Sequence, residues 1–243
     1  MTRPAPFAAT ALAATLCLVA PARADAQWYF DGYLGGNHTR PADVSVDQPD
    51  TDVALDYRDV RFTAEPLTTP PYYGWRIGRF FGADRRVGVE FEFVHLKAIA
   101  DTGRVYDVAD RGRSLDLVAP GPMSDVVQRY SMTHGLNFLL VNAVVRQPFS
   151  AGRHALAFRI GAGPTLPHAE STVSGRSQEQ YEVAGLGGHA AAGATIGVWR
   201  TLAALVEYKL TYARPEIAIA GGTGRTSTLT HQVAAGFSLG LGR

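Results

Sequence analysis

Apolar and charged residues alternate along parts of this chain. In the stretch VEFEFVHLK, residues 89–97, valine and phenylalanine alternate with Glu90 and Glu92. Because successive side chains of a β-strand point to opposite faces, this pattern predicts a strand with one apolar and one charged face. Such a strand fits either a half-buried sheet or a membrane barrel whose apolar face contacts lipid.

Eight segments rich in Val, Leu, Phe, Tyr and Gly recur along the chain. They are Trp28–Gly36, Tyr72–Phe81, Val87–Ala100, Arg129–Phe149, Ala155–His168, Val183–Trp199, Ala203–Tyr212 and Ser227–Leu241. Short turns follow the second, fourth and sixth segments, and long polar loops follow the first, third, fifth and seventh. This asymmetry predicts an all-β, eight-stranded antiparallel up-and-down transmembrane barrel, with the long loops outside the cell. A soluble eight-stranded barrel does not require it.

The beginning of the chain indicates export. Arg3 precedes an apolar run over residues 7–20, and small residues follow. This is the pattern of a secretory signal peptide, so we expect residues 1–26 to be the signal and 27–243 to be the barrel. The single cysteine, Cys17, lies within the signal. The mature barrel must therefore fold without disulfides.

Charge and hydropathy narrow the class further. The formal net charge is +1, and no basic surface suggests nucleic acid. After the signal, no apolar run reaches the about 20 residues that a membrane-spanning helix needs. We expect a monomer in the bacterial outer membrane, inserted there by the assembly machinery and surrounded by outer-membrane lipids and lipopolysaccharide.

Charged residues also recur on the predicted strands. An arginine or lysine that faces lipid at the midplane costs about 2–4 kcal/mol, so these side chains should face the lumen. An eight-stranded barrel is just wide enough for side chains to fill it. We predict a paired network that plugs the lumen, formed by Asp31, Arg76, Glu90, Glu92, Arg159, Glu207 and Lys209.

Histidines gather toward the loop ends of the predicted strands. Strict alternation places His95 and Lys97 on the phenylalanine face, which requires a bulge near Val94 or a position above the hydrocarbon. The others that fall at this end are His134, His168, His189 and His231. An imidazole can act as a base or as a metal ligand. A divalent metal is one option for the cofactor, and interfacial histidines without chemistry are another.

Several stretches carry a resemblance to a known family. They are Pro71-Tyr72-Tyr73-Gly74, Glu92-Phe93-Val94-His95-Leu96-Lys97, His134-Gly135-Leu136-Asn137 with Asn142, and residues 163–170 and 207–212. In them the chain resembles outer-membrane barrels identified as lipid A oxidases. The resemblance implies that oxygen is used to convert the proximal glucosamine of lipid A into 2-aminogluconate in the outer leaflet.

The strand order adds a location to this implied activity. The third, fourth and fifth segments are neighbours in an antiparallel meander, so their outer ends lie close together. We therefore expect a catalytic site at the outer rim, with Lys97 contacting a lipid phosphate. Its catalytic residues would be His95, His134, His168, Glu92 and Asn137. A non-catalytic barrel for envelope stability or adhesion, and a conduit for small apolar molecules, stay open as alternatives.

Overall fold

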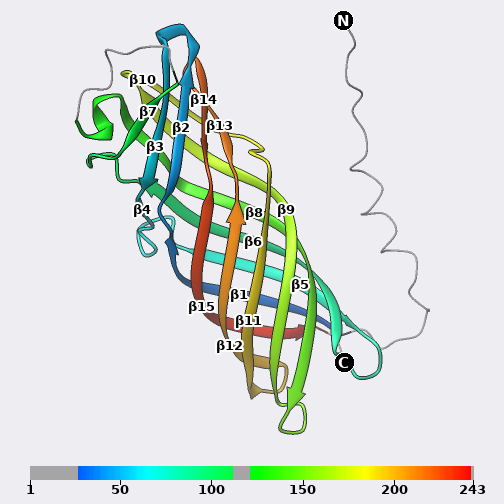
Figure 1. The fold of residues 1–243 in the computed structure, drawn as a ribbon. Helices are drawn as coiled ribbons and strands as arrows, with labels where there is room; N and C mark the ends of the chain where they lie inside the picture. The colour runs from blue at the N-terminus through cyan, green and yellow to red at the C-terminus, as the bar shows by residue number, and fades with distance from the viewer. Residues whose placement is uncertain (1–26, 112–120, 242–243) are drawn as a thin grey trace, which may run out of the picture.

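The computed structural model describes residues 27–111 and 121–241, so the predicted signal peptide lies outside the described residues. Eight long strands within these ranges close into an antiparallel barrel (Figure 1). In order around the barrel they are β1 (Gln27–Thr39), β5 (Tyr73–Phe81), β6 (Val87–Ala100), β8 (Val127–Phe149), β9 (His154–Val173), β11 (Leu186–Trp199), β12 (Leu202–Ala213) and β15 (Thr228–Leu241). The sheet closes because β15 pairs with β1. The predicted fold class is confirmed.

The strands between these eight differ from the polar loops that the sequence predicts. They are β2 (Ala42–Gln48), β3 (Val53–Val60), β4 (Phe62–Thr63), β7 (Val108–Asp110), β10 (Arg176–Tyr181), β13 (Glu216–Ile219) and β14 (Gly222–Thr226). Single helical turns occur at η2 (Pro49–Thr51) and η4 (Met123–Asp125). β13, β14, β2, β3 and β7 pair in that order to form a second sheet, which extends one end of the barrel (Figure 1).

The apolar core of this extension is continuous with buried residues of the barrel strands. Val46 and Leu55 lie opposite each other on β2 and β3, and both are buried together with Tyr130 and Ile217. Four acidic residues of the first long loop contact arginines: Asp43, Asp47, Asp50 and Asp56. Asp56 Oδ1, for example, lies 3.3 Å from an Arg111 nitrogen. The sequence pattern did not identify these arginine partners, because several of them come from distant segments of the chain.

The exterior of the barrel is apolar over most of its height. Alternate residues of β9 point outward, and Phe158 and Ile160 are 58% and 67% exposed. Other exposed apolar side chains of the barrel are Trp28, Leu34, Trp75, Ile77, Phe81, Val87, Val89, Phe91, Val141, Val145, Phe149, Leu156, Ile196, Val198, Trp199, Val206, Tyr208, Tyr212, Val233, Phe237 and Leu241. A continuous apolar surface of this extent is expected where lipid covers the protein.

The lumen contains ion pairs centred on two arginines. Arg76 Nε donates to Asp31 Oδ2 at 2.7 Å, and its two terminal nitrogens each contact a Glu207 oxygen at 3.0 Å. Arg159 donates to Glu207 Oε2 at 2.7 Å and to Glu90 Oε1 at 2.9 Å. All five side chains are buried. Each guanidinium is thus shared between carboxylates, which offsets part of its desolvation cost.

Glu92 joins this network from the neighbouring position on the inner face. It accepts hydrogen bonds from Tyr33 at 2.6 Å, from Asn142 at 2.7 Å and from the Lys209 ammonium. His189 also faces the lumen, where its Nε2 lies 2.9 Å from Asn142 Oδ1. His189 therefore does not share the outer rim with the other histidines, contrary to the expectation from the sequence.

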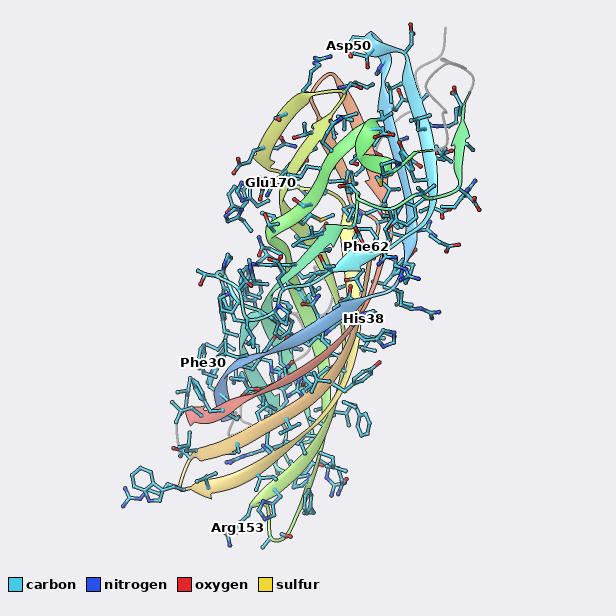
Figure 2. All side chains as sticks on the ribbon, turned by 90° about the vertical axis from the view of Figure 1, so that its left-hand side faces the viewer. Phe30, His38, Asp50, Phe62, Arg153 and Glu170 are labelled. Carbon is cyan, nitrogen blue, oxygen red and sulfur yellow. The ribbon has the colours of Figure 1, made fainter. Side chains whose placement is uncertain are left out.

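The two ends of the barrel offer a test of topology. Asp50 and Arg153 mark these ends in Figure 2. Leu67, on the side of the long connections, and Asp84, in the β5–β6 turn, are both exposed. We expect a membrane-impermeant maleimide to label Leu67→Cys on intact cells, and to label Asp84→Cys only after lysis. The reverse labelling would invert the predicted orientation.

Candidate functional site

β9 places polar side chains directly beyond the lipid-facing surface. Its outward residues over 156–166 are apolar or small, and the next outward residues are His168 and Glu170. A tilted strand needs about 9–11 residues to cross the hydrocarbon. Because residues 156–166 match that length, we expect His168 and Glu170, on the outer face of β9, to lie at the height of the lipid headgroups.

An irregularity in β8 brings a second histidine to the same place. The pairing of β8 with β9 shifts register between Ser131 and Leu136, and His134 lies in the shifted segment. Gly135 has a φ of +117°, and a Cβ there would lie 2.4 Å from the His95 ring. Glycine therefore permits both the backbone conformation and the close approach to His95. As a result His134 lies on the exterior, half exposed.

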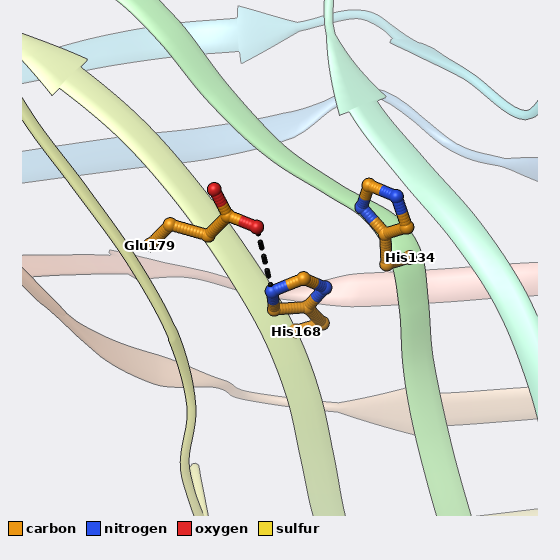
Figure 3. Close-up of side chains that lie close together, drawn as sticks. All are labelled: His134, His168 and Glu179. Carbon is orange, nitrogen blue, oxygen red and sulfur yellow. Dashed lines mark ion pairs between the residues drawn. The ribbon is translucent and has the colours of Figure 1, made fainter.

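Four side chains form what we call the rim cluster: His134, His168, Glu170 and Glu179. His134 Nδ1 lies 2.8 Å from Glu170 Oε1, and His168 Nε2 lies 3.0 Å from Glu179 Oε1. The centroids of the His134 and His168 rings are 4.8 Å apart, and Figure 3 shows the two rings side by side. Tyr181 stacks on His168 at 4.1 Å, since these two residues pair across β9 and β10.

Glu170 is the most enclosed carboxylate of the rim cluster. Burial acts to raise its pKa, but hydrogen bonds from Thr133 and His134 and the charge of Arg129 outweigh burial and lower the pKa. The carboxylate is therefore ionised at neutral pH and can hold the His134 ring in one orientation.

His95 and Asn137 lie beside the rim cluster on the same exterior face. His95 Nδ1 is 2.9 Å from Asn137 Oδ1, and Tyr73 stacks on the imidazole at 4.9 Å. The pairing of β5 with β6 runs without a shift through Val94, so no bulge turns His95 inward. His95 is 3% exposed, which makes it a buried neighbour of the rim cluster.

Two residues expected at this site lie elsewhere, as does a histidine expected at the same height of the barrel. Glu92 faces the lumen, on the opposite side of the barrel wall from His95. Lys97 is buried, and its Nζ donates to the Thr68 carbonyl at 3.0 Å. His231 contacts Tyr208 at 2.6 Å and pairs with His38 on another part of the barrel.

The sequence did not identify Glu170, Glu179 or Tyr181 as members of the site. Glu170 belongs to the stretch Gly163-Pro164-Thr165-Leu166-Pro167-His168-Ala169-Glu170, and alternation from His168 could have indicated its direction. Glu179 comes from β10, in a region expected to be a loop. Its position opposite Glu170 depends on the β9–β10 register.

Two hollows lie at opposite ends of the molecule. A shallow one of about 260 Å³ adjoins the rim cluster and is lined by Arg129, Glu170 and Glu179 among others. The other, of about 220 Å³, opens near the short turns, and its lining includes Asp31 and Arg159 of the lumen network. The first is lined by two carboxylates of the rim cluster, Glu170 and Glu179, which makes it the stronger candidate for chemistry.

Comparisons with known proteins bear on the fold alone. No family model and no curated protein matches the chain. Similar solved structures include Neisserial surface protein A (8% identity, 87% of this chain and 96% of that chain covered, TM-score 0.40). Another is Ail of Yersinia pestis (11% identity, 88% of this chain and 97% of that chain covered, TM-score 0.35). A third is the outer membrane protease OmpT of Escherichia coli (9% identity, 88% of this chain and 97% of that chain covered, TM-score 0.46).

The structure itself defines the class of protein. Within the described residues, no helix is both long and apolar enough to cross a membrane. A closed antiparallel barrel with an apolar exterior, a charged interior, short turns at one end and long connections at the other is the architecture of bacterial outer-membrane proteins. The chain is an outer-membrane β-barrel, with a polar cluster on its outer surface at the lipid boundary.

Proposed function

We propose that this barrel modifies lipid A in the outer leaflet, and that the rim cluster is its active site. The observation that carries the proposal is the position of His168 and Glu170. They follow the lipid-facing residues of β9 without a break and lie on the outer face of that strand rather than on its luminal face. A lipid headgroup beside the barrel would meet these side chains without entering it.

The reaction we assign is oxidation of the proximal glucosamine, as the resemblance to lipid A oxidases implies. Conversion of a sugar C1 hemiacetal to a lactone removes two electrons and two protons, and dioxygen would accept both to give hydrogen peroxide. Hydrolysis of the lactone by water then gives the 2-aminogluconate unit. The rim cluster would supply the base that removes the hydroxyl proton.

A second candidate function is adhesion, which the extension above the barrel favours. Its sheet buries apolar side chains such as Val44, Val46 and Ile217, so it presents a defined surface rather than flexible loops. A conduit is favoured less, because buried ion pairs of Arg76 and Arg159 cross the lumen. Neither alternative accounts for a histidine–carboxylate cluster at the lipid boundary.

The experiment that tests the proposal compares lipid A from cells with and without this protein. In cells that carry the gene, we expect mass spectrometry to show lipid A with one added oxygen on the proximal sugar. The product should require oxygen during growth and should be absent from cells with an empty vector. Identical lipid A spectra from oxygenated cells of both kinds would exclude the proposed reaction and leave adhesion as the better candidate.

A further inference from the structure

Three side chains of the rim cluster have the chemistry and spacing of a metal site. Ligand atoms of His134, His168 and Glu179 all lie within 4.8 Å of one another, and no other group of three such residues meets this criterion in the described part of the chain. They come from three different strands, β8, β9 and β10, and Figure 3 shows the Glu179 carboxylate against the His168 ring with the His134 ring nearby.

The distance between His168 and Glu179 already suits one ion. Two ligands bound about 2.1 Å from a metal and roughly 90° apart lie about 3.0 Å from each other. The His168 Nε2 to Glu179 Oε1 distance is 3.0 Å. An ion placed between these atoms would replace their hydrogen bond without requiring them to separate, and a modest movement of the exposed His134 ring would complete the set.

Neighbouring side chains fix the orientation of both histidine rings, as is usual for histidines that bind metal. Glu170 contacts Nδ1 of His134, which leaves Nε2 of that ring available for an ion. A carboxylate in this position fixes the orientation of a metal-bound imidazole and increases its basicity. On the other side, the stacked Tyr181 ring limits rotation of His168.

From this geometry we infer that His134, His168 and Glu179 bind one divalent transition-metal ion on the outer surface of the barrel. Two imidazole nitrogens and one carboxylate oxygen suit a first-row transition ion better than magnesium or calcium, which prefer sets of oxygen ligands. Three protein ligands leave at least one coordination position open, as in catalytic rather than structural sites. The inference goes beyond the proposed function, because an ion can bind here whether or not lipid A is a substrate.

Cobalt(II) is the probe that tests this site. The full chain, expressed without a polyhistidine tag, is extracted in detergent, freed of metal with a chelator and titrated with cobalt. We expect a visible absorption band that saturates at one ion per chain and disappears when zinc is added. His168→Ala and Glu179→Gln should abolish the saturable band, and Glu170→Gln should weaken binding about 10–100-fold.

Two controls make the outcome decisive. His154→Ala, at the short-turn end, removes a histidine far from the cluster and should leave cobalt binding unchanged. Heat-modifiable migration in gels shows that each variant retains the barrel. The Glu179→Gln variant should fold normally, because Glu179 is exposed and glutamine has nearly the same shape as glutamate. Absence of saturable binding, or equal binding by folded wild type and Glu179→Gln, would overturn the inference. Cobalt binding with unchanged lipid A would reject the proposed function alone.

Discussion

Arg76→Ala is expected to destabilise the barrel more than any other single substitution in the lumen. Arg76 is fully buried and contacts three carboxylates, on Asp31, Glu92 and Glu207. Alanine would leave these charges close together without their central cation. Breaking one such buried pair costs about 3–5 kcal/mol, so the free energy of unfolding should fall by at least that amount. Urea unfolding in detergent, followed by heat-modifiable migration, measures the change.

The control for this prediction is Arg86→Ala in the β5–β6 turn. Arg86 is exposed and lies 3.6 Å from the exposed Asp84, so its loss should change the unfolding free energy by less than about 1 kcal/mol. Adding Glu207→Gln to Arg76→Ala should recover part of the lost stability, because it removes one of the uncompensated charges. If Arg76→Ala is as stable as Arg86→Ala, the lumen is hydrated and the network contributes little.

The barrel strands were predictable because lipid and lumen impose opposite preferences on alternate residues. On β6 the alternation of phenylalanine with Glu90 and Glu92 marks both faces, and the predicted bounds of that strand, Val87–Ala100, are those of the structure. The extension was not predictable in the same way. Two of its pairings, of β14 with β2 and of β3 with β7, join segments that are distant in sequence, and no local pattern indicates their registers.

The rim cluster shows the same division between local and non-local information. Alternation alone places His168 outward and Glu92 inward, so combining these two residues in one site conflicted with the strand period. The position of His134 depends on the irregularity between Ser131 and Leu136, which only the β8–β9 pairing reveals. Glu179 enters through the β10 hairpin, whose turn at Ser174 and Gly175 has positive φ angles. The register with which β10 pairs with β9 after that turn brings the Glu179 carboxylate to His168.

His168→Ala and His134→Ala are expected to reduce lipid A oxidation about a hundredfold or more, the effect of removing a catalytic acid or base. Both side chains are partly exposed at the barrel surface, so their loss should leave the barrel intact. The measurement is the ratio of oxidised to unoxidised lipid A by mass spectrometry, in cells that express each variant at equal, heat-modifiable levels.

The matched control is His231→Ala, another histidine on the exterior, which contacts Tyr208 instead of a carboxylate. It should oxidise lipid A at the wild-type rate. His95→Ala should have an intermediate effect, because His95 contacts Asn137 beneath Tyr73 and approaches the backbone of Gly135 rather than joining the rim cluster. Full activity of both His134→Ala and His168→Ala would show that these imidazoles are interfacial residues. Equal losses in all four variants would indicate instead that exterior histidines support the fold, since the His231 side chain has no contact with the proposed chemistry.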